Sequence, residues 1–292
     1  MGASEVCGGD RRAAGGFGRR VACTSPRLGT MARSMDGAEL VTSRAHAALG
    51  RLGFDLHRYP VRLEYLDGVL AMEGELPDVA AKKRALERGA ALPEVRWVAD
   101  RLRVEPSVGM SDAEVLDHLR DVLLSEPTFD ECTVRVRRGG ALDVFREPPR
   151  PRGALEVAVD EGVVRLEGAV PSLSHKRLAG VLCWWAPGTR DVVNALEVDA
   201  PEEDNDDEIS DAVRIVLEKD PLLDASEIGV STERSRVTLR GLVASEEQRR
   251  IAEHDAWYVF GVNDVSNEIE VSQDVRRRVT PPRGSRERCP HS

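Results

Sequence analysis

Seven residues near the C-terminal end set the pattern of this chain: Ser235-Arg236-Val237-Thr238-Leu239-Arg240-Gly241. Polar and apolar side chains alternate before the glycine, which is typical of a half-buried β-strand. The same skeleton ends at Gly74 and at Gly168. Thirty residues after each of the three glycines, a second alternating pattern ends in a valine: Val104, Val198 and Val271. One interval kept in three places indicates an internal repeat.

Each copy has the pattern of helix, strand, strand, helix and strand. In the third copy, apolar residues recur at helical spacing from Ile209 to Leu217, and Ser245 and Gln248 have the spacing of a capping box. Strands two and three flank a helix and should therefore be parallel, with a right-handed crossover. We expect an α+β fold of three tandem αββαβ units, each a three-stranded mixed sheet with two helices packed on one face.

The repeat and the composition shifts predict six segments. They are a disordered N-terminal tail (1–36), a diverged first unit (37–106), a second unit (110–199), an acidic linker (200–206), a third unit (207–272) and a basic disordered tail (273–292). The second unit holds an insertion at about 130–153. We expect an extra strand at Cys132-x-Val134-x-Val136 and a stiff proline segment at 148–151.

Composition narrows the classes of function. The 292 residues carry a net charge of −10, with basic ends and an acidic middle, so nucleic acid is not an expected partner. No apolar run is long enough for a transmembrane segment, and residues 1–35 lack the apolar core of a signal peptide. The chain as written is therefore expected in the cytoplasm, with peripheral membrane association open and a periplasmic location only with a different N-terminus.

The C-terminal copy resembles a known family. Residues 237–243, followed by 261–271, look like the BON domain, named after bacterial osmotically inducible and nodulation proteins. The third copy matches through Gly241, Gly261, Val262, Val265 and Asn267. The second matches through Gly168, Gly188, Val192 and Asn194, with Thr189 in place of a valine. The first is the most diverged, with Glu94 in place of glycine and Asp100 in place of asparagine.

The resemblance implies an αββαβ domain with a non-enzymatic binding function. Relatives are mostly envelope proteins thought to contact phospholipid, and some bind potassium or accompany stress responses. The motif residues also have structural explanations. The glycines that end strand two, Gly74, Gly168 and Gly241, tolerate backbone angles closed to other residues. The amides of Asn194 and Asn267 should point inward, where they either fix a neighbouring loop or contact a ligand.

Paired aromatic residues are the main candidate for a binding site. Trp184 and Trp257 occupy equivalent positions near the end of the second helix in their copies, followed by Trp185 and Tyr258. These rings either cover the edge of each small core or form a patch for lipid or a protein partner. Cys183 lies at a position that holds Gly89 in the first copy and Ala256 in the third, which indicates a small buried residue rather than a reactive thiol.

Catalytic and metal-binding patterns are missing from the sequence. The six histidines are scattered, the five cysteines form no CxxC, and the carboxylates of 202–208 lack the spacing of a calcium loop. We therefore expect no catalytic residue, cofactor or metal. The predicted function is a non-enzymatic tandem BON-domain protein that contacts a phospholipid surface or an envelope or stress-related protein. The alternative is a cytosolic ion-responsive protein of the potassium type, or a regulatory protein–protein scaffold.

Overall fold

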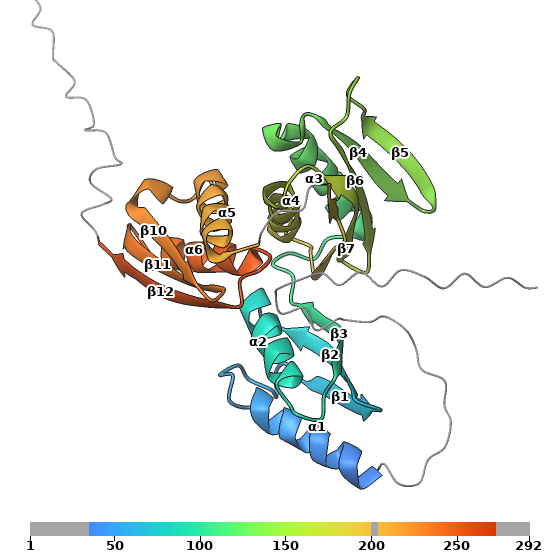
Figure 1. Ribbon diagram of the computed structural model, residues 1–292, viewed down its shortest axis with the longest axis vertical. Coiled ribbons are helices and arrows are strands. Elements are labelled where there is room, and N and C mark those ends of the chain that lie inside the picture. Colours follow the sequence, from blue (N-terminus) through green and yellow to red (C-terminus); the bar gives the residue numbers. More distant parts are fainter. Residues whose placement is uncertain (1–34, 200–203, 273–292) are drawn as a thin grey trace, which may run out of the picture.

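The computed structural model describes residues 35–199 and 204–272, which form three lobes (Figure 1). We call residues 35–106 unit 1, residues 107–199 unit 2 and residues 204–272 unit 3. The predicted tails and most of the predicted linker lie outside the described residues, although the first helix already begins at Met35. None of the described helices is long and apolar enough to cross a membrane.

Units 1 and 3 share one topology. Unit 1 consists of α1 (Met35–Leu49), β1 (Val61–Leu66), β2 (Val69–Leu76), α2 (Val79–Ala90) and β3 (Trp97–Val104). Unit 3 consists of α5 (Asp206–Lys219), the short η2 (Ala225–Glu227), β10 (Ile228–Glu233), β11 (Arg236–Val243), α6 (Glu246–Tyr258) and β12 (Asp264–Val271). In both sheets the central strand pairs antiparallel with the strand before it and parallel with the strand after it. The α+β prediction is confirmed.

Alternation along the strands places the cores. On the central strand of unit 3, Val237 and Leu239 are fully buried beneath the helices, while Arg240, the next residue along the strand, is exposed. Leu70 and Met72 have the same place in unit 1. Both helices of each unit therefore cover the apolar face of the sheet.

Unit 2 is larger than expected. It consists of α3 (Asp112–Ser125), η1 (Pro127–Phe129), β4 (Cys132–Arg138), β5 (Ala141–Arg146), β6 (Gly153–Asp160), β7 (Val163–Val170), α4 (Leu173–Trp185), β8 (Asp191–Asn194) and β9 (Glu197–Val198). The prediction of a three-stranded sheet is wrong here, because the insertion contributes two strands to a sheet of six. The predicted extra strand is β4, which runs parallel to β6, and β5 returns beside it after a Gly139-Gly140 turn.

The glycine two residues before the end of each central strand makes a close approach to backbone. Gly241 has φ +144°, and a Cβ built on it would lie 1.9 Å from the carbonyl oxygen of Glu227. Gly74 and Gly168 have positive φ and the same kind of carbonyl neighbour. We expect Gly241→Ala to lower the free energy of unfolding by about 1–3 kcal/mol, measured by urea denaturation, because the strand must move away from Glu227.

Gly229 is a matched control for that substitution in the same sheet. A Cβ built on Gly229 meets its nearest heavy atom at 3.6 Å, which is ordinary contact. Gly229→Ala should therefore leave the unfolding midpoint nearly unchanged. Equal losses from Gly229→Ala and Gly241→Ala would show that the carbonyl contact is not the cause.

Candidate binding site at the junction of the three units

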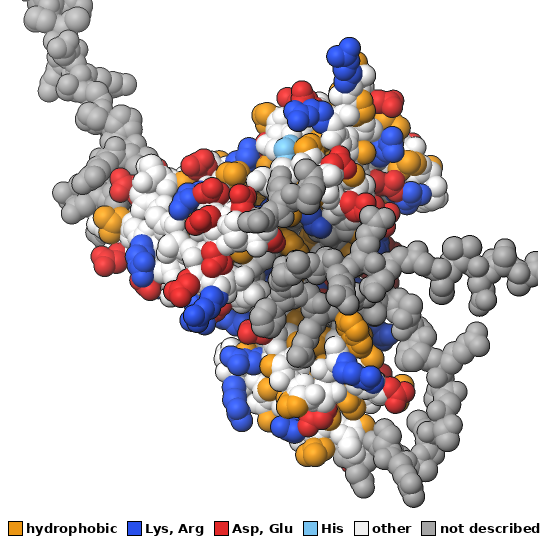
Figure 2. Space-filling model, in the orientation of Figure 1, with side chains coloured by type: hydrophobic (Ala, Val, Ile, Leu, Met, Phe, Trp, Pro, Cys, Tyr) orange, Lys and Arg blue, Asp and Glu red, His pale blue; other side chains and the backbone are white. Residues whose placement is uncertain are grey.

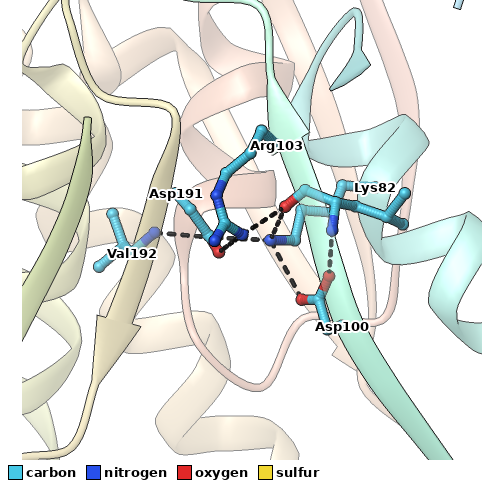
Figure 3. A network of polar contacts seen from close by, with 6 residues as sticks. Lys82, Asp100, Arg103, Asp191 and Val192 are labelled. Carbon is cyan, nitrogen blue, oxygen red and sulfur yellow. Dashed lines mark hydrogen bonds and ion pairs between the residues drawn. The ribbon is translucent and has the colours of Figure 1, made fainter. Parts of the chain in front are cut away.

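Three consecutive basic residues on α2 join unit 1 to the other two units. Lys82 extends its ammonium to Asp191 at the start of β8 in unit 2, with 2.5 Å between Nζ and Oδ1 (Figure 3). Arg103 on β3 contacts the other oxygen of Asp191 at 3.0 Å. Lys82 also lies 3.1 Å from Asp100 and donates to the carbonyl of Leu102. Lys82 is only 5% exposed, so these charges neutralise one another away from water.

This network explains a departure from the repeat pattern. In units 2 and 3, the side-chain amides of Asn194 and Asn267 donate to the carbonyls of Lys176 and Arg249, at 2.7 and 2.8 Å. In unit 1, Asp100 takes the place of these asparagines, and Lys82 takes the place of Lys176 and Arg249. The carboxylate of Asp100 cannot donate a hydrogen bond, so it accepts one from the side-chain ammonium of Lys82 instead. The asparagine amides therefore fix the first turn of a helix, not a loop as one interpretation of the sequence expected.

The next two residues of α2 contact unit 3. The ammonium of Lys83 donates to three carbonyls at the C-terminal end of α6, those of Trp257, Val259 and Val262, at 2.6–3.1 Å. A cation there is favoured by the negative end of the helix dipole. The guanidinium of Arg84 lies 4.9 Å from the centre of the Trp257 ring and pairs with Asp264. Unit 1 thus holds both neighbours with adjacent residues of one helix.

Units 2 and 3 meet through aromatic side chains. Trp184 at the end of α4 stacks on Tyr258 at the end of α6, with 5.9 Å between ring centres. The indole N–H of Trp185 donates to Asp255 at 2.8 Å. Val181 of α4 is buried within the core of unit 3. The ends of α2, α4 and α6 therefore converge where the three lobes meet (Figure 1).

A cleft of about 410 Å³ opens at this junction. We call it the junction cleft; its lining includes Pro77, Asp78, Glu105 and Pro106 of unit 1, Ser107, Trp184 and Pro187 of unit 2, and His254, Trp257 and Tyr258 of unit 3. Aromatic rings, prolines and acidic side chains are thus combined in one concave site, the usual form of a ligand site.

The four predicted aromatic residues are brought together, but not as a flat exposed patch. Trp257 is 1% exposed because α2 covers its ring, so it does not present a face to solvent. Trp184 and Tyr258 are half-buried and line the cleft, whereas Trp185 packs between the cores of units 2 and 3. A role for these residues in binding stays a prediction.

The glycine and cysteine positions singled out in the sequence are structural. Gly188 lies against Met110 and Val115, which leave no room for a Cβ, and Gly261 has φ +97° just after α6. Cys183 is fully buried, and burial raises the pKa of its thiol, so the thiolate is disfavoured.

Polar groups of the cleft favour a ligand that accepts hydrogen bonds and carries positive charge. The hydroxyl of Tyr258 is the donor in question, because the indole N–H of Trp257 is buried, although it has no hydrogen-bond partner among the described residues. Asp78 and Glu105 add negative charge at the rim. Burial, with the nearby carboxylates of Asp255 and Asp78, raises the pKa of Tyr258 to about 12, so its hydroxyl stays protonated at neutral pH.

The contact between Trp185 and Asp255 should respond to pH. Burial raises the pKa of Asp255 to about 8, assisted by the neighbouring Asp220, while donation from Trp185 acts in the opposite direction. Because the folded-state pKa lies above that of an unfolded aspartate, about 4, the stabilisation from neutral Asp255 is complete below pH 4. It is lost as the pH rises through about 8.

We therefore expect Asp255→Asn to stabilise the chain relative to the parent protein, increasingly between pH 5 and pH 8. The asparagine stays uncharged and its oxygen still accepts from Trp185. Urea unfolding at several pH values measures the difference, in which contributions from other titrating groups common to both proteins cancel. Parallel stability curves for the two proteins would contradict the assignment of Asp255.

Comparisons with known proteins identify the domain in two segments. The family model of the BON domain matches residues 146–200 and 205–273, which span unit 2 from the end of β5 onward and the described part of unit 3. No curated protein matches the chain. The predicted BON resemblance is thus confirmed for these two segments.

Among solved structures, two of CdsD, a structural protein of the type III secretion system of Chlamydia trachomatis, are similar to the chain. Its C-terminal domain has 16% identity and a TM-score of 0.21, covering 78% of this chain and 95% of that one. A second CdsD structure has 15% identity and a TM-score of 0.20, covering 84% of this chain and 99% of that one.

Proposed function

We propose that the chain is a non-enzymatic binding protein whose junction cleft holds an extended segment of a partner protein. The observation that carries this proposal is a concave site built jointly by three units, with the stacked rings of Trp184 and Tyr258 in its lining. The protonated hydroxyl of Tyr258 can donate to a backbone carbonyl of an extended segment, and Asp78 and Glu105 suit a basic side chain beside it.

Unit 1 completes this site, and we propose that it is a third, diverged copy of the BON domain. Its strand order and register are those of unit 3. Asp78 caps α2 at the place where Ser172 and Ser245 cap the equivalent helices. The substitution of Asp100 for asparagine is accounted for by its contact with Lys82.

A protein segment suits the cleft better than a phospholipid surface. A membrane is broad, whereas the rings of Trp184 and Tyr258 stack on each other inside a concave site. Asp78 and Glu105 at its rim would also repel anionic headgroups. The carboxylate of Asp78 is occupied as a helix cap and that of Glu105 accepts from Tyr59, which supports binding rather than acid–base catalysis.

Site-specific photocrosslinking tests the proposal. Ser107, an exposed residue of the cleft, is replaced by the photoreactive amino acid p-benzoylphenylalanine in the full chain, which is then irradiated in living cells. We expect a polypeptide adduct that is lost when Trp184→Ala is added. The same probe at Leu242, exposed on β11 away from the cleft, should give none. A lipid adduct, or no adduct from Ser107, would reject a protein ligand.

A further inference from the structure

The connection between β5 and β6 is a proline-rich projection. Its sequence is Glu147-Pro148-Pro149-Arg150-Pro151-Arg152, with a bend at Pro149 and Arg150. Pro149, Arg150 and Pro151 are exposed. The projection forms the uppermost tip of unit 2 in Figure 1, and basic and hydrophobic side chains lie together at that tip in Figure 2. The proline segment that the sequence predicts is thus presented to solvent.

Rigidity and an available charge make this projection suitable for binding. Three of its six residues are prolines, whose rings fix the backbone and hold the residue before each proline extended, so little conformational freedom is lost on binding. The neighbouring Arg146 and Arg152 pair with Asp130 and Glu131. Arg150 forms neither a hydrogen bond nor an ion pair with any residue of 35–199 or 204–272. Its guanidinium is therefore available to a partner.

The junction cleft offers groups that complement the projection. The stacked rings of Trp184 and Tyr258 lie in its lining, and grooves lined by aromatic rings are suited to proline-rich segments. Asp78 caps α2 through Oδ1 alone, and its charge helps to raise the pKa of Tyr258, so it acts within the cleft. No described lysine or arginine pairs with Asp78, whereas Glu105 lies 3.4 Å from Arg58. Asp78 is therefore the carboxylate that is open to a cation from outside.

The projection and the cleft lie at opposite ends of the sheet in unit 2. β6 begins at Gly153, directly after the projection, and ends at Asp160, which pairs with Val163 on β7. Val163 also pairs with Asp191, which follows Thr189 of the cleft lining by two residues. A strand of eight residues spans about 25 Å. Because strands hold both ends of the projection, it cannot reach the cleft of its own chain, but it can enter that of another copy.

We propose that the partner protein is a second copy of this chain, whose Pro149, Arg150 and Pro151 enter the junction cleft. This inference rests on the function proposed for the cleft and names its partner. The proline rings pack on the stacked aromatic rings, and Arg150 pairs with Asp78. The hydroxyl of Tyr258 donates to a backbone carbonyl of the projection. Because the projection and the cleft are different surfaces, each copy can give a segment and receive one.

Sedimentation velocity of the full chain tests this contact. We expect the mean mass of the parent protein to rise with concentration. Arg150→Glu removes the cation of the projection and Trp184→Ala removes a ring of the cleft, so each should weaken self-association by about tenfold or more. A mixture of the two variants should associate again as a complex of one copy of each, because the first keeps its cleft and the second keeps its projection.

Arg51→Glu is the matched control for the change in charge. Arg51 is exposed in unit 1 and forms no ion pair with a described residue, so its substitution should leave self-association unchanged. The peptide acetyl-Glu-Pro-Pro-Arg-Pro-Arg-amide, which copies residues 147–152, should dissociate the assembled parent protein, whereas its counterpart with glutamate at position 150 should not. Circular dichroism shows whether each variant is folded.

The mass of the photocrosslinked adduct from position 107 separates this inference from the function proposed for the cleft. We expect an adduct of twice the mass of the chain. An adduct with a different protein would overturn a second copy as the partner and leave the proposed function standing, whereas a lipid adduct would overturn both. A parent protein that stays monomeric, a mixture that does not associate, or an equal loss with Arg51→Glu would also overturn the inference.

Discussion

Replacing Lys82 by methionine should lower the free energy of unfolding by about 3–5 kcal/mol, the range for removing one partner of a buried ion pair. The substitution leaves Asp100 and Asp191 close together, shielded from water, with Arg103 as the remaining cation. Urea denaturation followed by circular dichroism measures the loss.

Two further proteins separate this effect from a general loss of charge. Arg62→Met removes an ion pair whose arginine side chain is 71% exposed, and it should cost about 0–1 kcal/mol. Adding Asp100→Asn and Asp191→Asn to Lys82→Met should recover part of the loss, because the buried negative charges disappear. A cost below that of Arg62→Met, or no recovery in the triple variant, would show that the network does not stabilise the junction.

Trp257→Ala should have an effect of similar size, about 3–5 kcal/mol. The ring is 1% exposed, belongs to the core of unit 3 and also supports Arg84 of unit 1. Its removal opens a cavity and weakens the contact between two units at once. We expect a lower unfolding midpoint in urea and a lower thermal midpoint.

Trp184→Ala is the matched comparison, because Trp184 has the same place in its own repeat. It is half-buried and its main ring contact is Tyr258, so its loss should cost about 1 kcal/mol. Similar losses of unfolding free energy from both substitutions would show that burial does not determine the cost at these equivalent positions. The adduct formed from position 107 in the cleft should nevertheless be lost with Trp184→Ala.

The order of helices and strands could be predicted from the sequence, because it depends on patterns among neighbouring residues. Alternation around Val237 and Leu239, the constant interval after each glycine and the helix caps gave the strand–strand–helix–strand order of all three units. β5 was missed because it lies in an insertion without a counterpart in the repeat. Its alternating Leu142 and Val144 after Gly139-Gly140 are nevertheless a hairpin signal.

Contacts between units could not be derived in the same way. A buried lysine on α2 and an aspartate on β8 are far apart in the chain, and no local pattern specifies which exposed face of one unit meets another. Trp184 and Trp257 are equivalent in sequence, yet only Trp257 is covered by α2. The one signal was Asp100, whose departure from asparagine marked the place where unit 1 acquired a charged neighbour.

The placement of Lys82, Lys83 and Arg84 on one helix means that the three units cannot exchange places in the chain. A chimera that shuffled the units, or a truncation that excised unit 1, would leave Asp191 without its cations and the carbonyls at the end of α6 without a donor. Each unit therefore carries side chains that another unit needs, so the three lobes act as parts of one assembly.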